Sequence, residues 1–322
     1  MSVPSRSTPL ISVALCTFNG ARYLREQLDS VLAQTEVTIE VVAVDDGSQD
    51  ATRAILQEFA AREPRIRWHG NERNLGPTAS FERAMSLCKG EFIAPCDQDD
   101  IWHRDKLVRL LAAIDGCDLA YCDSEYVDAD GQALRRRVSD DRTMLAGTAP
   151  TAFLFANSVS GHASLLRREL FDRARPFPNR VYHDWWLALC AAGGNGVGYL
   201  DRPLVRFRRH ADAYSPMGKS AAAARDAIAS RAWLEQRHCL LQAYSRSRFR
   251  DNEIALTLAN ALRRAIDLGR NDALMRLLWR HRRGLPRWNG IPALDALRLQ
   301  ALFLRKLHRA RRGRVGENPR AD

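Results

Sequence analysis

Three carboxylates stand within four residues, at Asp97, Asp99 and Asp100, directly after the apolar run 92–95. Like charges repel and burial of a charge is costly, so a strand that ends in clustered carboxylates needs a compensating partner. Mg²⁺ or Mn²⁺ is one such partner, because hard cations take oxygen ligands and bridge carboxylates to substrate phosphates. A solvated acidic turn before a helix starting at His103 is the alternative interpretation, and the Asp-x-Asp spacing alone leaves both open.

Strand and helix patterns alternate around this motif through the first third of the chain. The strands are apolar throughout, which is typical of a parallel sheet covered by helices on both faces. Ligands bind beyond the carboxyl ends of such strands. We therefore expect three polar segments that follow strands to converge on one crevice, namely Thr17-Phe18-Asn19, Asp45-Asp46 and Asp97-Gln98-Asp99-Asp100.

After Val127 the pattern changes. A hairpin turn is predicted at 128–131 and a mobile loop from Arg135-Arg136-Arg137 to Thr148. Further predictions are helices at 151–157 and 181–192, short strands at 199–200 and 204–207, and only helices from Ala221 onward. The expected organisation is an α/β catalytic domain at 1–219 and an all-helical extension at 220–322.

Length and composition restrict the class of protein. A chain of 322 residues with 46% hydrophobic and 27% charged residues is expected to form one large or two modest soluble domains. No signal peptide or apolar run of membrane-spanning length is recognised. The seven cysteines form no C-x-x-C pair, so reduced, buried thiols and a cytoplasmic location are predicted.

The basic excess is confined to the last third of the chain. Residues 220–322 contain 22 Lys and Arg against 9 Asp and Glu, whereas residues 1–219 contain 27 against 29. One predicted helix pairs an apolar stripe (Leu294, Leu297, Ala301, Leu304) with Arg298, Arg305, Lys306 and Arg309. We predict an anionic membrane surface as its partner, at the inner face of the cytoplasmic membrane. Packing on the catalytic domain or on a second subunit is the alternative.

The order of four motifs resembles that of family 2 glycosyltransferases with the GT-A fold. The resemblance covers roughly residues 8–215, and its motifs are Thr17-Phe18-Asn19-Gly20, Val44-Asp45-Asp46-Gly47-Ser48, Asn74-Leu75-Gly76 and Asp97-Gln98-Asp99-Asp100. It implies a Rossmann-like, mostly parallel sheet flanked by helices. Asp-Gln-Asp-Asp-Ile-Trp and the later His183-Asp184-Trp185-Trp186 resemble the rhamnosyltransferase branch, which uses dTDP-L-rhamnose to build bacterial surface polysaccharides.

The resemblance implies an inverting, metal-dependent transfer of a sugar from a dTDP- or UDP-sugar to a cell-surface glycan or lipid-linked saccharide. Asp45 would accept the imide N–H of a uracil or thymine ring, although a plain Asp-Gly turn is the alternative. Arg208 would clamp the diphosphate. The full nucleotide-binding set would be Thr17, Phe18, Asn19, Asp45, Asp46, Asn74, Asp97 and Arg208.

Metal, base and acceptor roles follow from the same resemblance. Asp99 would bind the metal directly, with Asp97 and His210 completing the set. Asp184 would be the general base, and His183 is the second candidate because its ordinary pKa suits the task. The acceptor region would comprise His183, Trp185, Trp186, Gly161 and His162. One of the two tryptophans is expected to be core, and the glycine to allow close approach of substrate.

Other functions fit the sequence less well. A sugar-nucleotide pyrophosphorylase or a Rossmann dehydrogenase needs a glycine-rich loop after the first strand, where residues 16–20 hold one glycine. A nucleic-acid-binding protein would account for the basic extension, but clustered carboxylates without metal would repel phosphate, so nucleic acid is not an expected partner. A galactosyl- or N-acetylglucosaminyltransferase of the same family remains the nearest alternative.

Overall fold

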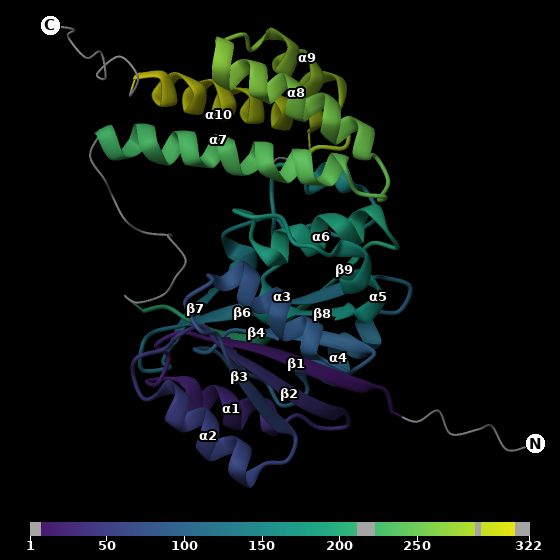
Figure 1. The fold of residues 1–322 in the computed structure, drawn as a ribbon. Coiled ribbons are helices and arrows are strands. Elements are labelled where there is room, and N and C mark those ends of the chain that lie inside the picture. Colours follow the sequence, from purple (N-terminus) through teal and green to yellow (C-terminus); the bar gives the residue numbers. More distant parts are fainter. Residues whose placement is uncertain (1–7, 211–222, 287–290, 313–322) are drawn as a thin grey trace, which may run out of the picture. The chain divides into compact units, whose positions relative to one another are not determined.

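The computed structural model describes residues 8–210, 223–286 and 291–312 (Figure 1). The chain divides into two compact units. The first contains residues up to 148, 158–177 and 182–210, and the second contains 149–157, 178–181 and the described residues from 223 onward. The predicted boundary between residues 219 and 220 lies outside the described residues, so it stays a prediction.

The first unit is built on one mixed sheet. Its described strands are β1 (Leu10–Thr17), β2 (Thr38–Asp45), β3 (Ile66–Gly70), β4 (Phe92–Cys96), β5 (Ile101–Trp102), β6 (Leu119–Val127), β7 (Ala133–Arg137), β8 (Ser164–Arg167) and β9 (Val197–Arg208). Their order is β3-β2-β1-β4-β8-β6-β9-β5, with β7 on β6. Only the pairings that involve β8, β7 or β5 are antiparallel, which confirms the predicted mostly parallel sheet.

Register in the parallel part places the predicted polar segments at one edge. Thr17, the last residue of β1, pairs with Asp45, the last residue of β2. On the other side of β1, Leu15 pairs with Cys96, which ends β4. The loops after these three strands therefore leave the sheet side by side.

Helices cover both faces of the sheet. They are α1 (Leu24–Leu32), α2 (Thr52–Arg62), α3 (Pro77–Leu87), α4 (Lys106–Ala113), α5 (Arg168–Ala174) and α6 (His183–Gly193). Figure 1 shows α1 and α2 on one face and α3 and α6 on the other. Leucines of α1 and α4, such as Leu28 and Leu110, share a core with Val13 and Val41 of the sheet. Burial on both faces explains why the strands are apolar without alternation.

Three local predictions were wrong. Arg135-Arg136-Arg137 belongs to β7, which pairs with β6 through the turn at 128–131, because the exposed arginines need no burial to complete the hairpin. Residues 151–157 form only the end of a short 3₁₀ turn (Pro150–Ala152). The two short strands predicted near residue 200 are a single strand, β9, since its pairing with β6 continues across a register shift.

The second unit is helical, as predicted. It contains α7 (Ala223–Ser245), α8 (Asn252–Leu268), α9 (Asp272–Arg280) and α10 (Pro292–Arg312). Phe303 of α10 is fully buried and meets Trp233 of α7 edge-on, with ring centroids 5.2 Å apart. Among the described helices none is long and apolar enough to cross a membrane. All seven cysteines are free; Cys88, Cys96, Cys122 and Cys190 are buried as predicted, whereas Cys16, Cys117 and Cys239 are only partly buried.

Candidate active site

The loops after β1, β2 and β4 are joined by direct hydrogen bonds. Gln98 accepts a bond from the Phe18 backbone N–H at 2.8 Å and donates its amide N–H to the Phe18 carbonyl at 3.1 Å. The Asn19 backbone N–H donates to Ser48 Oγ at 2.9 Å. A Cβ on Gly20 would lie 2.1 Å from Gln98 Oε1, so a side chain there would displace Gln98 from these hydrogen bonds. The predicted convergence of the three segments is therefore confirmed.

Asp45 lies fully buried at the base of this junction. Its Oδ1 accepts a hydrogen bond from Thr17 Oγ1 at 3.0 Å, and its Oδ2 accepts bonds from the Ser48 backbone N–H at 3.0 Å and from Arg53 Nε at 2.6 Å. Sequence reasoning missed Arg53, because an arginine in the first turn of a helix is usually solvated. Its partly exposed guanidinium now stands between Asp45 and solvent.

Asp46 organises the loop after β3. Its Oδ1 accepts hydrogen bonds from Asn71 Nδ2 at 2.7 Å and from the Leu75 backbone N–H at 2.8 Å, and its Oδ2 accepts the Gly76 N–H at 2.9 Å. The exposed Asn74 also uses its side-chain oxygen within this loop, accepting the Gly76 N–H at 3.0 Å. Both side chains thus shape the loop, and their contact with a nucleotide stays a prediction.

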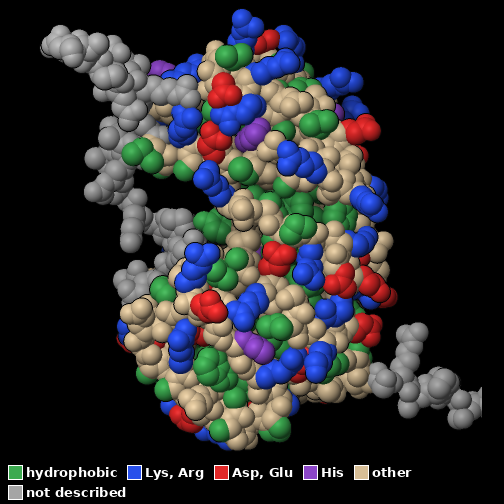
Figure 2. Space-filling model, viewed as in Figure 1, with side chains coloured by type: hydrophobic (Ala, Val, Ile, Leu, Met, Phe, Trp, Pro, Cys, Tyr) green, Lys and Arg blue, Asp and Glu red, His purple; other side chains and the backbone are tan. Residues whose placement is uncertain are grey.

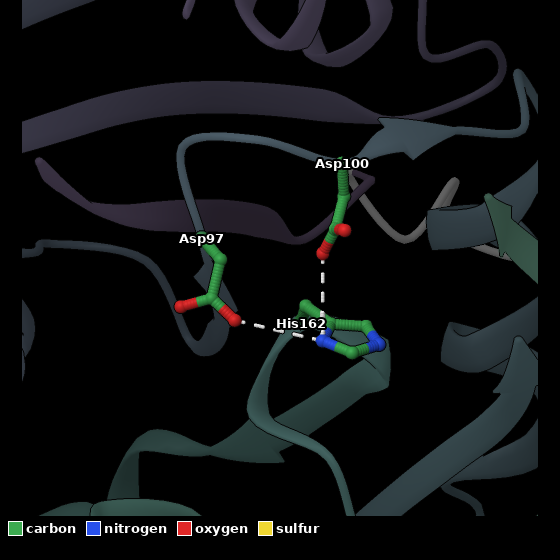
Figure 3. Close-up of side chains that lie close together, drawn as sticks. All are labelled: Asp97, Asp100 and His162. Atoms are coloured by element: carbon green, nitrogen blue, oxygen red, sulfur yellow. Dashed lines mark ion pairs between the residues drawn. The ribbon is translucent and has the colours of Figure 1, made fainter. Parts of the chain in front are cut away.

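A histidine from a distant loop completes the carboxylate cluster (Figure 3). His162 Nδ1 lies 3.5 Å from Asp97 Oδ2 and 3.4 Å from Asp100 Oδ2. Asp100 also accepts the Arg208 backbone N–H at 3.0 Å, so it supports the loop, yet its buried Oδ2 has no hydrogen-bond partner. The predicted acceptor residue His162 therefore belongs to the acidic cluster, whose three ligand atoms lie within 4.8 Å of one another.

Burial and mutual charge set the protonation of this cluster. Burial, together with the negative charges of Asp99 and Asp97, raises the pKa of Asp100 to about 7. Burial opposes ionisation of Asp97, but the hydrogen bond and charge of His162 outweigh it and lower the pKa of Asp97. Burial likewise opposes the charged form of His162, and the charges of Asp100 and Asp97 raise its pKa nonetheless. Asp100 therefore changes protonation near neutral pH, while the contact between Asp97 and His162 favours the carboxylate of the one and the imidazolium of the other.

Lys106 is a second buried cation beside the cluster. Its side chain is fully buried, and Nζ donates a hydrogen bond to the His162 carbonyl at 2.5 Å. Nζ also lies 3.1 Å from the centre of the Trp102 ring, within the range of a cation–π contact. Burial lowers its pKa to about 8. No sequence signal distinguishes this lysine from a solvated one at the start of a helix.

Asp99 and His210 form a separate pair. His210 Nε2 lies 2.9 Å from Asp99 Oδ2, and its ring packs 4.8 Å from the ring of Tyr23. The other ring nitrogen, Nδ1, is buried without a hydrogen-bond partner. The predicted metal set is thus divided, because Asp97 contacts His162 while Asp99 contacts His210.

Arg208 is buried and anchors the carboxylate loop. Its Nε donates to the Asp99 carbonyl at 2.9 Å, and Nη1 donates to the Ala129 carbonyl at 2.9 Å. Nη2 forms a 2.5 Å ion pair with Glu26, and the guanidinium lies 4.6 Å from the Tyr23 ring centre. Only 2% of the side chain is exposed, so the geometry assigns it a positioning role, and diphosphate binding by Arg208 stays a prediction.

His183 begins α6 in a tight setting. Its buried ring stacks on Phe81 with centroids 3.9 Å apart, and burial lowers its pKa. A Cβ on Gly161 would lie 2.7 Å from His183 Nε2. In the structure this glycine gives room to the imidazole, and close approach of substrate to it stays a prediction.

Asp184 follows in the first turn of α6 and is partly exposed. Its Oδ1 accepts the Trp185 backbone N–H at 2.6 Å. Burial raises the pKa of Asp184, and the charge of Asp97 adds to this effect. Trp185 and Trp186 are 5% and 4% exposed, and Trp186 Nε1 donates to the Ala174 carbonyl at 2.8 Å. Burial favours packing for both indoles, and acceptor stacking stays a prediction.

Comparison with known proteins identifies the family that the chain matches. Residues 12–175 match the model for glycosyl transferase family 2. An uncharacterized glycosyltransferase of Nostoc sp. is 28% identical over 70% of this chain and 72% of its own length. The succinoglycan biosynthesis protein ExoO of Rhizobium meliloti is 31% identical over 51% of this chain and 48% of its own. An uncharacterized protein of Mycobacterium bovis is 30% identical over 62% of this chain, and the match spans 59% of that protein's length.

Solved structures share the fold. Staphylococcus aureus TarS, crystallised with UDP-GlcNAc, aligns over 97% of this chain and 93% of its own, with a TM-score of 0.59 and 18% identity. A mannosyltransferase from Pyrobaculum calidifontis, solved with GDP-Man and Mn²⁺, covers 97% of this chain and 89% of its own, with a TM-score of 0.52 and 17% identity. Identity this low shows similarity of fold alone.

Proposed function

The chain belongs to glycosyl transferase family 2 and is a glycosyltransferase, and we propose that it catalyses an inverting, metal-dependent transfer of a sugar from a nucleoside diphosphate to a saccharide hydroxyl. The observation that carries the proposal is the meeting of three strand-end loops around Asp97–Asp100. The carboxylates at this edge of the sheet would assist departure of the diphosphate, and Asp184 at the start of α6 would act as the base.

The donor pocket would lie over the junction of Phe18, Asn19 and Asp45. A nucleotide base that hydrogen-bonds to Asp45 would share this carboxylate with the exposed Arg53 or displace it. We take dTDP-L-rhamnose as the donor, on the resemblance of residues 97–102 and 183–186 to rhamnosyltransferases. The likeness to TarS, crystallised with UDP-GlcNAc, supports a UDP-sugar as the second candidate.

The residues present fit a divalent cation. Asp99 Oδ2 and the neighbouring His210 supply an oxygen and a nitrogen ligand. Asp100 Oδ2, which pairs with His162 but has no hydrogen-bond partner, supports spare ligand capacity in the acidic loop. Asp99 and His210, with Asp97 from the same loop, would hold Mg²⁺ or Mn²⁺. The ion would neutralise charge on the diphosphate leaving group. Mn²⁺ in the mannosyltransferase structure supports this assignment.

Asp184 would accept the proton of the acceptor hydroxyl. Its carboxylate is partly exposed at a helix start, and a pKa above the ordinary aspartate value makes it a stronger proton acceptor. His183 is less suited, because its ring is stacked on Phe81 and its Nε2 faces Gly161. We assign His183 to the support of Asp184.

The acceptor would be a growing cell-surface glycan or a lipid-linked saccharide, met at the cytoplasmic face of the membrane. The polysaccharide role named for ExoO supports this choice. The test is transfer measured over a panel of dTDP-, UDP- and GDP-sugars with Mg²⁺, Mn²⁺ or EDTA. Metal-dependent turnover that is fastest with dTDP-L-rhamnose is expected. Faster turnover with UDP-GlcNAc or UDP-galactose would replace the donor, and no metal dependence would overturn the mechanism.

A further inference from the structure

Helix α10 has two apolar faces, of which only one is covered. Ala296, Leu299, Phe303 and Leu307 are buried, at 2% exposure or less. Leu294, Leu297 and Leu304 are 49%, 50% and 42% exposed, and Ala301 between them is exposed too. At 3.6 residues per turn, these four residues form one continuous stripe on the side opposite the buried face. We call Leu294, Leu297, Ala301 and Leu304 the outer stripe.

Cations follow the outer stripe along one flank. Arg298 and Arg305 are exposed, and helical spacing places them next to the stripe rather than against the core. The only acidic residue of α10, Asp295, is 1% exposed. The outer surface of this helix therefore presents leucine beside arginine, and the one carboxylate of α10 is buried.

The segment before α10 also exposes apolar side chains. Trp279 of α9 is 41% exposed, and the Arg282 guanidinium lies 5.0 Å from its ring centre. Ile291, directly before α10, is 53% exposed. On the face drawn in Figure 2, Lys and Arg side chains are more frequent than Asp and Glu over the helical unit. This agrees with the 22 basic and 9 acidic residues of 220–322.

We propose that the outer stripe of α10 is a docking surface for an anionic lipid bilayer, with the leucines entering the headgroup–acyl boundary and Arg298 and Arg305 meeting lipid phosphates. An exposed apolar stripe beside cations is the arrangement of helices that lie in a membrane interface. Long arginine side chains reach the headgroups while their stems stay on apolar surface.

Charge argues against a second copy of the chain as the occupant. A two-fold symmetric contact through the outer stripe would bring Arg298 and Arg305 of both copies together. No acidic side chain on the described outer face of α10 is available to relieve that repulsion. An anionic bilayer has the complementary charge, and it also accepts the leucines.

Flotation of the full chain with vesicles tests the proposal. Vesicles of phosphatidylcholine with phosphatidylglycerol are compared with vesicles of phosphatidylcholine alone, at low and high salt. The chain is expected to float with the anionic vesicles at low salt. The double variant Leu297→Glu and Leu304→Glu should lower the bound fraction by about tenfold or more. The double variant Arg298→Gln and Arg305→Gln should reduce the part of vesicle binding that high salt removes.

The control variant is Leu268→Glu, which changes a 66% exposed leucine of α8 and should leave flotation unchanged. Thermal melts verify that the variants are folded, since all the altered side chains are exposed. Equal flotation of the wild type and the double glutamate variant would overturn the proposal. It would also be overturned if the wild-type chain did not bind vesicles but formed a dimer that the two glutamates abolish. Because no donor or acceptor is needed, failure here leaves the proposed transfer reaction standing.

Discussion

His210 Nε2 lies 2.9 Å from Asp99 Oδ2, although 111 residues separate the two in the chain. This contact holds the segment after β9 against the loop after β4. The same loop also receives Arg208, whose buried guanidinium donates to the Asp99 carbonyl at 2.9 Å. Two residues of the 205–210 segment thus hold Asp99 in place from both its backbone and its carboxylate.

Loss of either member of this pair should remove metal dependence. We expect Asp99→Asn or His210→Ala to lower transfer by about 100-fold or more, because metal stabilisation of a leaving group contributes several kcal/mol. Calorimetry should show that Mn²⁺ no longer strengthens nucleotide binding. Asp130→Ala is the control, since its side chain is 81% exposed. Wild-type turnover in EDTA would contradict the assignment.

Asp184 should control the acidic limb of the pH–rate profile. Its pKa is raised by burial, so the carboxyl stays protonated to a higher pH than an exposed aspartate, and kcat/KM should rise as pH increases through that pKa. Asp184→Asn should lower the rate by about two to four decades and abolish this limb while donor binding persists. An active Asp184→Asn beside an inactive His183→Ala would transfer the role to His183.

Lys106 should make the stability of the fold depend on pH in the alkaline range. Burial lowers its pKa from 10.5 to about 8, so between these values the unfolded chain holds the proton more tightly than the folded one. Stability from this group therefore rises as pH increases from about 8 to 10.5. Lys106→Met should remove that rise and also lower activity, because the support of His162 is lost. The measurement is urea unfolding across pH.

Lys89→Met is the matched control for that experiment, because Lys89 is exposed and the hydrogen bonds that the structure gives it come from its backbone N–H. It should reproduce the pH dependence of the wild-type chain. If Lys106→Met keeps the same alkaline rise, another group is responsible for it.

A side chain at Gly161 should lower the stability of the fold while His183 is present. Gly161→Ala would place a Cβ 2.7 Å from His183 Nε2, and overpacking of this kind costs about 1–3 kcal/mol. Gly70→Ala is the control, because the nearest atom to its new Cβ lies at 3.7 Å. Adding His183→Ala should recover part of the lost stability in a double-mutant cycle. Additive losses would show that the two residues are independent.

Local sequence determined the sheet and the strand ends at which the candidate site lies. Apolar strands without alternation required a sheet covered on both faces, and parallel strands bring their carboxyl ends to one edge. For this reason the meeting of Thr17, Asp45 and Asp97 could be predicted from their positions after strands. The helical character of residues after 223 was equally accessible from spacing.

Tertiary structure decided the partners of those residues. His162 reaches Asp97 and Asp100 only because β8 runs antiparallel between β4 and β6, a pairing that no local pattern encodes. Whether Lys106 is buried, or which apolar stripe of α10 is covered, likewise depends on neighbouring elements. Periodicity shows that a face is apolar, but burial depends on long-range packing, which is set by residues far away in the chain.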